Sequence, residues 1–241
     1  MHTDQLPNGG KFKVINLGEN CSSRAVLERY GIKEESFPFD SVITPIDSLL
    51  QCLRDDFANF VTPEHFKLYF DKHSPVNKYG IVLAHSFPII DLQDNTPQLT
   101  CEQIFKMSGM VPYDVKHTLE HDKVQRPRQM ISPKWREILP EVAEKYRRRI
   151  TRMRECCQGE GKVYFFRCND LSKETAIQLV SILDRLYPRL NYTVIAVCNR
   201  PDSVCEKWNI PKVKNYVVNV HNQGDTEWHR IFQDSISIPI L

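Results

Sequence analysis

The stretch Val14-Ile15-Asn16-Leu17-Gly18-Glu19-Asn20-Cys21-Ser22-Ser23 has the pattern of a buried strand that ends at a glycine turn and leads directly into a helix. This pattern places Cys21 on the first turn of the helix. The first N–H groups of a helix lack intrahelical partners and carry partial positive charge, so they stabilise a thiolate, an oxyanion or a phosphate. We therefore expect a reactive cysteine or an anion-binding turn here.

Apolar runs and amphipathic helical patterns alternate along the rest of the chain. The runs are short and almost continuously hydrophobic, which is typical of strands buried on both faces of a parallel sheet. Between them, apolar residues recur every three or four positions, as on one face of a helix. These patterns predict strands at 12–17, 79–84, 163–167, 192–197 and 216–220, and a short one at 36–39. They predict helices at 22–30, 45–57, 135–153, 172–187 and 226–232.

Strands that alternate with helices predict an α/β fold, in which crossing helices join parallel strands. We expect a single three-layer domain over residues 1–241, with a mostly parallel, Rossmann-like or flavodoxin-like sheet. A chain of 241 residues is long enough for one well-buried domain of this kind. Residues 91–132 interrupt the alternation, because they are mostly polar and include Pro97, Pro112 and Pro127. We expect this segment to be an insertion or a lid.

Composition and charge do not require a nucleic-acid partner, and they indicate no membrane span. The net charge is +2, which gives no strong signal for nucleic acid. No apolar run reaches the roughly 20 residues that cross a bilayer, and residues 1–11 lack the apolar core of a signal peptide. The eight cysteines include no C-x-x-C pair. We therefore expect reduced thiols and a cytoplasmic location.

Nucleophilic and acid–base groups follow the predicted strands. In a parallel sheet, ligands bind beyond the carboxyl ends of the strands. Cys21 follows the first predicted strand, Asp40 follows the run at 36–39, and His85 follows the run at 79–84. These residue types suit a thiol hydrolase in which Cys21 attacks, His85 accepts the proton and Asp40 orients the imidazole.

Further polar residues at the same predicted edge suit the binding of a substrate or an anion. The N–H groups around the turn would form an oxyanion site. Side chains that follow the strands would add hydrogen bonds to a charged group. The residues expected in this role are Gly18, Asn20, Ser22, Arg167 and Asn169.

Several of these motifs resemble a family of unknown function labelled papain-like cysteine peptidases. Two positions differ from the family pattern, because Ser41 replaces its usual tryptophan and Ser86 follows the histidine where an acid is common. The resemblance implies a hydrolase with a Cys/His/Asp constellation. We expect a thiol-dependent hydrolase or acyl transferase whose substrate is a peptide or a small molecule. The resemblance also implies a papain-like α+β fold as the alternative to the parallel sheet. The motifs are Leu17-Gly18-Glu19-Asn20-Cys21, Arg24-Ala25-Val26-Leu27, Ser36-Phe37-Pro38-Phe39-Asp40, His85, Tyr164-Phe165-Phe166-Arg167 and Asp225-Thr226-Glu227-Trp228.

The residues leave two other functions open. The turn at Gly18, with Arg167 and Arg200, would suit a non-catalytic module that binds an anion or a phosphate. Alternatively, Arg167-Cys168-Asn169-Asp170 is similar to a sequence block of SGNH-type esterases, and Asp225 with His229 is similar to their final acid–histidine pair.

Two further motifs have simpler explanations. The segment His117-Thr118-Leu119-Glu120-His121 matches the H-x-x-E-H spacing of a zinc peptidase, but its polar flanks lack a buried face to hold a rigid site. We therefore expect no metal and no other cofactor. Arg147, Arg148 and Arg149 lie on the exposed face of a predicted helix, where they contact water or an acidic partner.

Overall fold

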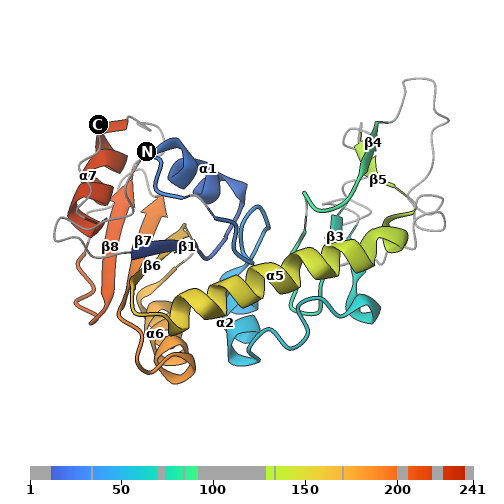
Figure 1. The fold of residues 1–241 in the computed structure, drawn as a ribbon. Helices are drawn as coiled ribbons and strands as arrows, with labels where there is room; N and C mark the ends of the chain where they lie inside the picture. The colour runs from blue at the N-terminus through green and yellow to red at the C-terminus, as the bar shows by residue number, and fades with distance from the viewer. Residues whose placement is uncertain are drawn as a thin grey trace.

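The core of the molecule is a parallel sheet. The computed structural model describes residues 12–33, 35–69, 74–83, 85–91, 129–132, 134–169, 171–199, 206–218 and 225–236. Within these residues, neighbouring strands of the sheet are parallel and lie side by side (Figure 1). The sheet confirms the predicted α/β fold rather than the papain-like α+β alternative. Its strands, in spatial order, are β1 (Phe12–Asn16), β6 (Lys162–Cys168), β7 (Tyr192–Asn199) and β8 (Val213–Val218).

Helices cover both faces of the sheet and complete the three predicted layers. Alternate residues of the strands point to the two faces, so that Val14 and Phe166 contact one layer of helices while Ile15 and Phe165 contact the other. The first layer contains α1 (Cys21–Arg29) and α7 (Asp225–Ile236). The second contains α2 (Ile46–Arg54), α5 (Leu139–Gln158) and α6 (Lys173–Leu186).

Two short antiparallel strand pairs lie near the N-terminal end of α5 (Figure 1). The pairing of β4 with β5 joins the two ends of the predicted insertion at 91–132. Residues 92–128 of that segment lie outside the described residues, so its role as a lid stays a prediction. The pairs are β2 (Lys67–Tyr69) with β3 (Ser74–Val76), and β4 (Ile89–Asp91) with β5 (Gln129–Ile131); two 3-10 helices, η1 (Pro63–His65) and η2 (Trp135–Ile138), lie nearby in sequence.

Local sequence signals set the bounds of α1 and α6. Asn20 is the N-cap of α1 and accepts a hydrogen bond from the N–H of Ser22 at 2.8 Å. Gly31, with a φ of +63°, follows its end and donates to the carbonyl group of Glu28 at 3.0 Å. In α6, Ser172 forms a capping box with the third helical residue.

The helix α5 is amphipathic and 20 residues long. Pro140 lies in its first turn, where the missing N–H of proline costs no intrahelical hydrogen bond. Its buried face includes Val142, Tyr146, Ile150 and Met153. No described helix, α5 included, is both long enough and apolar enough to cross a membrane.

The prediction of strands at 79–84 and at 36–39 was wrong. In the described part of the first segment, Val82 makes isolated β-bridges to Ile43 and Val76, and the chain turns at Gly80, whose φ is +82°. The second segment ends in a turn. Both are apolar because they pack in the same core as α2 and α5, so hydrophobicity alone did not distinguish them from strands.

Candidate functional site

The turn between β1 and α1 is tightly packed. Gly18 has a φ of +81°, a conformation that glycine adopts without strain. A Cβ atom at this position would lie 2.8 Å from Oγ1 of Thr44 and 3.2 Å from the carbonyl oxygen of Phe39. The N–H of Gly18 donates to Oδ1 of Asn16 at 3.2 Å. The turn therefore requires glycine for its backbone conformation and for its close contact with the loop that carries Thr44.

Gly18→Ala is expected to lower the free energy of unfolding by about 2–4 kcal/mol, because the left-handed conformation and the contact with Thr44 both oppose a methyl group. Urea denaturation measures the loss. Gly159→Ala is the matched control, since Gly159 has a φ of −76° and its added Cβ would meet nothing closer than 3.4 Å. We expect the control to change stability by less than about 0.5 kcal/mol. Equal losses in the two variants would contradict the prediction.

The start of α1 is held by hydrogen bonds within the turn. Cys21 is its first residue. Oδ1 of Asn20 accepts hydrogen bonds from both the N–H and the hydroxyl group of Ser22. The buried hydroxyl group of Ser23 donates to the carbonyl groups of Gly18 and Asn20 at 3.1 and 3.0 Å. The side chains of Asn20 and Ser22 are thus engaged in the helix cap.

Arg167, near the end of β6, is fully buried beside the same turn. Its Nη1 donates to the carbonyl group of Leu17 and its Nη2 to that of Thr44, both at 2.6 Å. The N–H of Thr44 in turn donates to the carbonyl group of Glu19 at 3.0 Å. The exposed side chain of Asn169 donates to Oε2 of Glu19 at 3.1 Å. Arg167 therefore joins the turn to the loop that carries Thr44.

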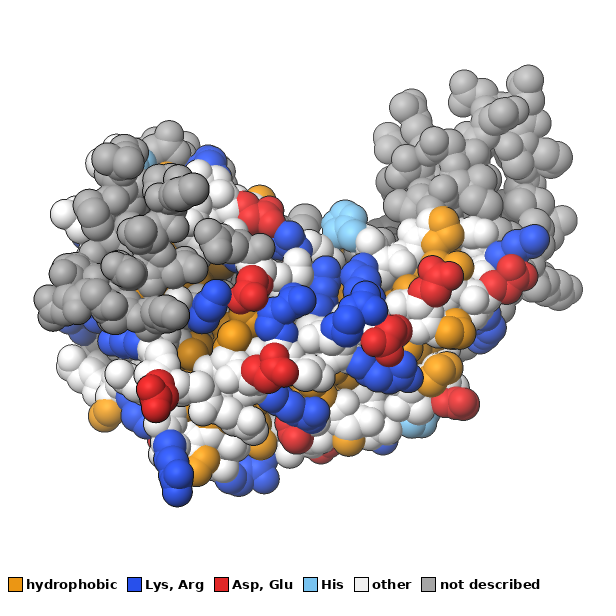
Figure 2. All heavy atoms as spheres, in the orientation of Figure 1, with side chains coloured by type: hydrophobic (Ala, Val, Ile, Leu, Met, Phe, Trp, Pro, Cys, Tyr) orange, Lys and Arg blue, Asp and Glu red, His pale blue; other side chains and the backbone are white. Residues whose placement is uncertain are grey.

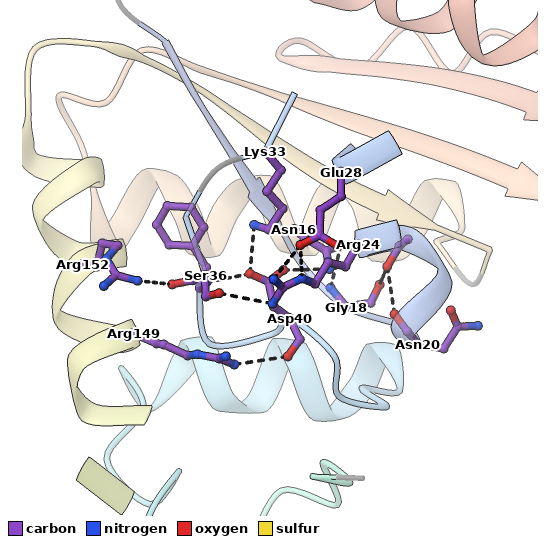
Figure 3. A network of polar contacts seen from close by, with 12 residues as sticks. Asn16, Gly18, Asn20, Arg24, Glu28, Lys33, Ser36, Asp40, Arg149 and Arg152 are labelled. Carbon is purple, nitrogen blue, oxygen red and sulfur yellow. Dashed lines mark hydrogen bonds and ion pairs between the residues drawn. The ribbon is translucent and has the colours of Figure 1, made fainter. Parts of the chain in front are cut away.

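Asp40 is fully buried, and its carboxylate contacts three groups (Figure 3). Oδ1 accepts a hydrogen bond from Asn16 at 3.1 Å, and Oδ2 accepts one from the N–H of Phe37 at 2.6 Å. Oδ2 also lies 2.9 Å from Nζ of Lys33, whose side chain is 1% exposed and whose pKa is lowered by burial. Within the described residues, no hydrogen bond or ion pair joins Asp40 to His85. The role of Asp40 in orienting the imidazole stays a prediction.

His85 is exposed, and the residue after it connects its loop to α5. Oγ of Ser86 lies 2.9 Å from the hydroxyl oxygen of Tyr146 and accepts a hydrogen bond from Nζ of Lys145 at 3.2 Å. Burial lowers the pKa of Lys145, and the positive charge of Arg24 in α1 acts in the same direction. These contacts bring the loop of His85 to the part of α5 that lies near α1.

The three consecutive arginines of α5 have different surroundings. Arg147 and Arg148 are exposed and pair with Glu144 at 3.3 and 3.6 Å. Arg149 is partly buried and donates to the carbonyl group of Asp40 at 3.4 Å. An acidic partner at these arginines stays a prediction, but the three do not form one exposed patch.

Among the described residues, Cys52, Cys156 and Cys157 are free thiols. Burial raises the pKa of Cys52 and Cys157, so both remain protonated at neutral pH. In the part of the chain that the structure describes, no group of three or more His, Cys, Asp and Glu side chains could hold a metal ion. The H-x-x-E-H motif at 117–121 lies outside that part.

A known protein family matches most of the chain. A family model described as putative papain-like cysteine peptidase (DUF1796) matches residues 12–199, which is more than half of the chain. The chain belongs to this family. The matched region includes the turn before α1, Cys21, Asp40, His85 and Arg167. No curated protein and no solved structure has a significant match to the chain.

This member of the papain-like cysteine peptidase family also contains basic side chains that the sequence patterns did not single out. Lys33 pairs with Asp40, and Lys145 contacts Ser86. Nothing in the local sequence distinguishes either lysine from a surface lysine. For Arg24, the sequence offered one indication, because the residue begins the family motif Arg24-Ala25-Val26-Leu27. Their roles follow from the packing of α1, α5 and the loop of Asp40 against one another (Figure 3).

Proposed function

We propose that the chain is a thiol-dependent hydrolase or acyl transferase that acts on an amide or ester of a peptide or small molecule. The observation that carries the proposal is the position of Cys21 as the first residue of α1, directly after the turn that follows β1. The family description supports it. A thiolate at the start of a helix is stabilised by the partial positive charge there, so its pKa falls.

In the proposed reaction, Sγ of Cys21 attacks the carbonyl carbon of the substrate and the thiol proton passes to His85. N–H groups at the start of α1 stabilise the oxyanion. The amine or alcohol leaves with the proton from His85, and the acyl group remains on Cys21 as a thioester. Water, or an alcohol or amine in a transferase, then attacks the thioester and gives its proton to His85. His85 returns this proton to the sulfur that leaves.

Asp40 and Arg167 are positioning residues in this reaction, because their contacts hold the turn in place. Arg167 binds two main-chain carbonyl groups on either side of it. Asp40 accepts a hydrogen bond from Asn16, which itself accepts one from the N–H of Gly18. Both side chains therefore act on the backbone that presents Cys21.

The pH dependence of alkylation tests the proposal. Iodoacetamide forms a thioether with the thiolate and releases iodide, so its rate follows the thiolate fraction. In the wild type, we expect Cys21 to be labelled rapidly below about pH 7. His85→Ala should shift labelling to higher pH, because the thiol loses its proton acceptor. Mass spectrometry of peptides assigns the label to individual cysteines.

Cys156 provides an internal control in the same experiment. It is half-buried in α5, and burial, together with the negative charge of Glu35, raises its pKa. Its labelling should therefore become fast only above about pH 8.5, the usual pKa of a free cysteine. The proposal is overturned if Cys21 is labelled no faster than Cys156 at every pH.

Slow labelling would favour the alternative function, a non-catalytic module that binds an anion or a phosphate. Two of the side chains predicted for that role, Arg167 and Asn169, are engaged in contacts within the protein. The esterase alternative gains no support, because the ring of His229 packs 5.0 Å from that of Tyr30. Tyr30 lies nine residues after Cys21, which corresponds to roughly 13 Å along a helix. His229 therefore packs at the end of α1 opposite to Cys21.

A cysteine nucleophile requires a reduced thiol, so we propose a cytoplasmic location for the protein. The free thiols among the described cysteines agree with a reducing compartment. Oxidation by a mild disulfide-forming reagent should block the labelling of Cys21, and a thiol reductant should restore it.

A further inference from the structure

A group of basic side chains from α1 and α5 surrounds the loop that ends at Asp40 (Figure 3). Nη1 of Arg24 donates to Oγ of Ser36 at 3.2 Å, and Nη1 of Arg152 donates to the carbonyl group of the same residue at 2.6 Å. Nη1 of Arg149 donates to the carbonyl group of Asp40 at 3.4 Å. The three guanidinium groups thus come together although α1 and α5 are far apart in the sequence.

Lys145 adds a fourth positive charge to this group. It is partly buried, one helical turn before Arg149, and its Nζ donates to Oγ of Ser86. Burial lowers the pKa of Lys145, and the charges of Arg149 and Arg24 lower it further. Burial also lowers the pKa of Arg149; Tyr146 and Asp40 oppose this effect, whereas Arg24 and Arg152 act in the same direction as burial. Lys145 and Arg149 are therefore close enough to each other and to Arg24 for their positive charges to repel, and Arg152 also repels Arg149.

The carboxylates nearby offset only part of these positive charges. Glu28 pairs with Arg24 at 2.6 Å, and Asp40 pairs with Lys33 at 2.9 Å. Among the described residues, no carboxylate forms an ion pair with Lys145, Arg149 or Arg152. Figure 2 shows Lys and Arg side chains gathered in the middle of this face, where α5 crosses the molecule. The cluster holds a surplus of positive charge that an anion would neutralise.

We propose that Arg24, Lys145 and Arg149 bind the phosphate group of a small-molecule ligand. Phosphate carries close to two negative charges near neutral pH, which suits several convergent cations better than a single carboxylate does. Guanidinium groups bind phosphate oxygens through two parallel hydrogen bonds, and Lys145 adds a point charge. The hydroxyl groups of Ser36 and Ser86 lie within the cluster and offer further donors.

Phosphate binding at these side chains does not require a nucleophilic cysteine. Arg24 lies three residues after Cys21, so the two share one side of α1. The bound phosphate would therefore lie beside the start of α1. Phosphate binding and cysteine labelling are separate measurements, and the failure of one leaves the other intact.

Calorimetric titration of the full chain with inorganic phosphate at low ionic strength tests the proposal. We expect saturable binding by the wild type that weakens with added salt. Lys145→Met and Arg149→Met should each raise the Kd by at least about tenfold, since each removes one charged contact. Arg147→Met is the matched control on the exposed side of α5 and should leave the Kd within about twofold.

Thermal unfolding with and without phosphate distinguishes a loss of binding from poor folding of a variant. Without phosphate, Lys145→Met should melt no earlier than the wild type, because it relieves repulsion between cations. With phosphate, the wild type should gain stability by mass action and Lys145→Met should not. The proposal is overturned if the wild type does not bind phosphate up to about 10 mM. It is also overturned if Lys145→Met and Arg149→Met bind as the wild type does, or if acetate binds as tightly as phosphate.

Discussion

Lys33→Met is expected to lower the free energy of unfolding by about 3–5 kcal/mol, although it replaces a buried charged side chain with an apolar one of similar length. The loss arises because Asp40, the partner of Lys33, remains charged and buried. The carboxylate of Asp40 is 0% exposed and lies 2.9 Å from Nζ of Lys33. Without that ammonium group, the negative charge of Asp40 stays buried; within the described residues it keeps hydrogen bonds from Asn16 and Phe37 but no ion pair. Urea denaturation with unchanged m-value measures the loss.

Two companion variants separate this explanation from a general effect of removing a lysine. Lys33→Met combined with Asp40→Asn should recover part of the lost stability, because the buried charge is gone and the amide oxygen still accepts one of the two hydrogen bonds that Asp40 accepts. Lys212→Met removes an ion pair to Asp184 whose two side chains are 43% and 45% exposed. It should cost less than about 1 kcal/mol. A double variant no more stable than the single one would show that the charge of Asp40 is not the cause.

Arg167→Met is expected to lower the free energy of unfolding by about 3–6 kcal/mol, since each hydrogen bond from a charged donor contributes about 1.5–3 kcal/mol. The guanidinium group is buried and reaches the carbonyl groups of both Leu17 and Thr44. Arg167→Lys should recover only part of the loss, because a single ammonium group cannot reproduce the two-pronged contact. The start of α1 depends on the same turn, so both variants should also slow the labelling of Cys21.

Arg185→Met is the control for Arg167. Arg185 also donates to a main-chain carbonyl group, that of Arg54 at 3.1 Å, but its side chain is exposed. Its removal should cost less than about 1 kcal/mol, because water replaces the lost contact. If Arg167→Met instead kept the stability of the wild type and lost only the binding of phosphate, then Arg167 would be a ligand-binding residue, as the sequence pattern suggested.

Much of the fold was predictable because hydrophobic periodicity is a local property. The runs predicted at 12–17, 163–167 and 192–197 became β1, β6 and β7, with shifts of a residue or two at their ends. The run at 79–84 was misread, since Ile81 and Leu83 are fully buried in a loop rather than in the sheet. Burial creates the same apolar pattern in both settings, and the partner that distinguishes them is remote in sequence.

The strand, the glycine turn and the helix start that place Cys21 as the first residue of α1 were predictable from local sequence, because they depend on neighbours along the chain. The surroundings of that helix start depend instead on contacts between remote segments. Asp40 and Arg167 both ended in buried contacts with groups of the protein, and the loop of His85 came to α5 through Ser86. Such pairings depend on the meeting of segments up to 150 residues apart. Local sequence patterns do not predict these pairings. The pairings form because polar groups that lose contact with water in the core need hydrogen-bond partners within the protein.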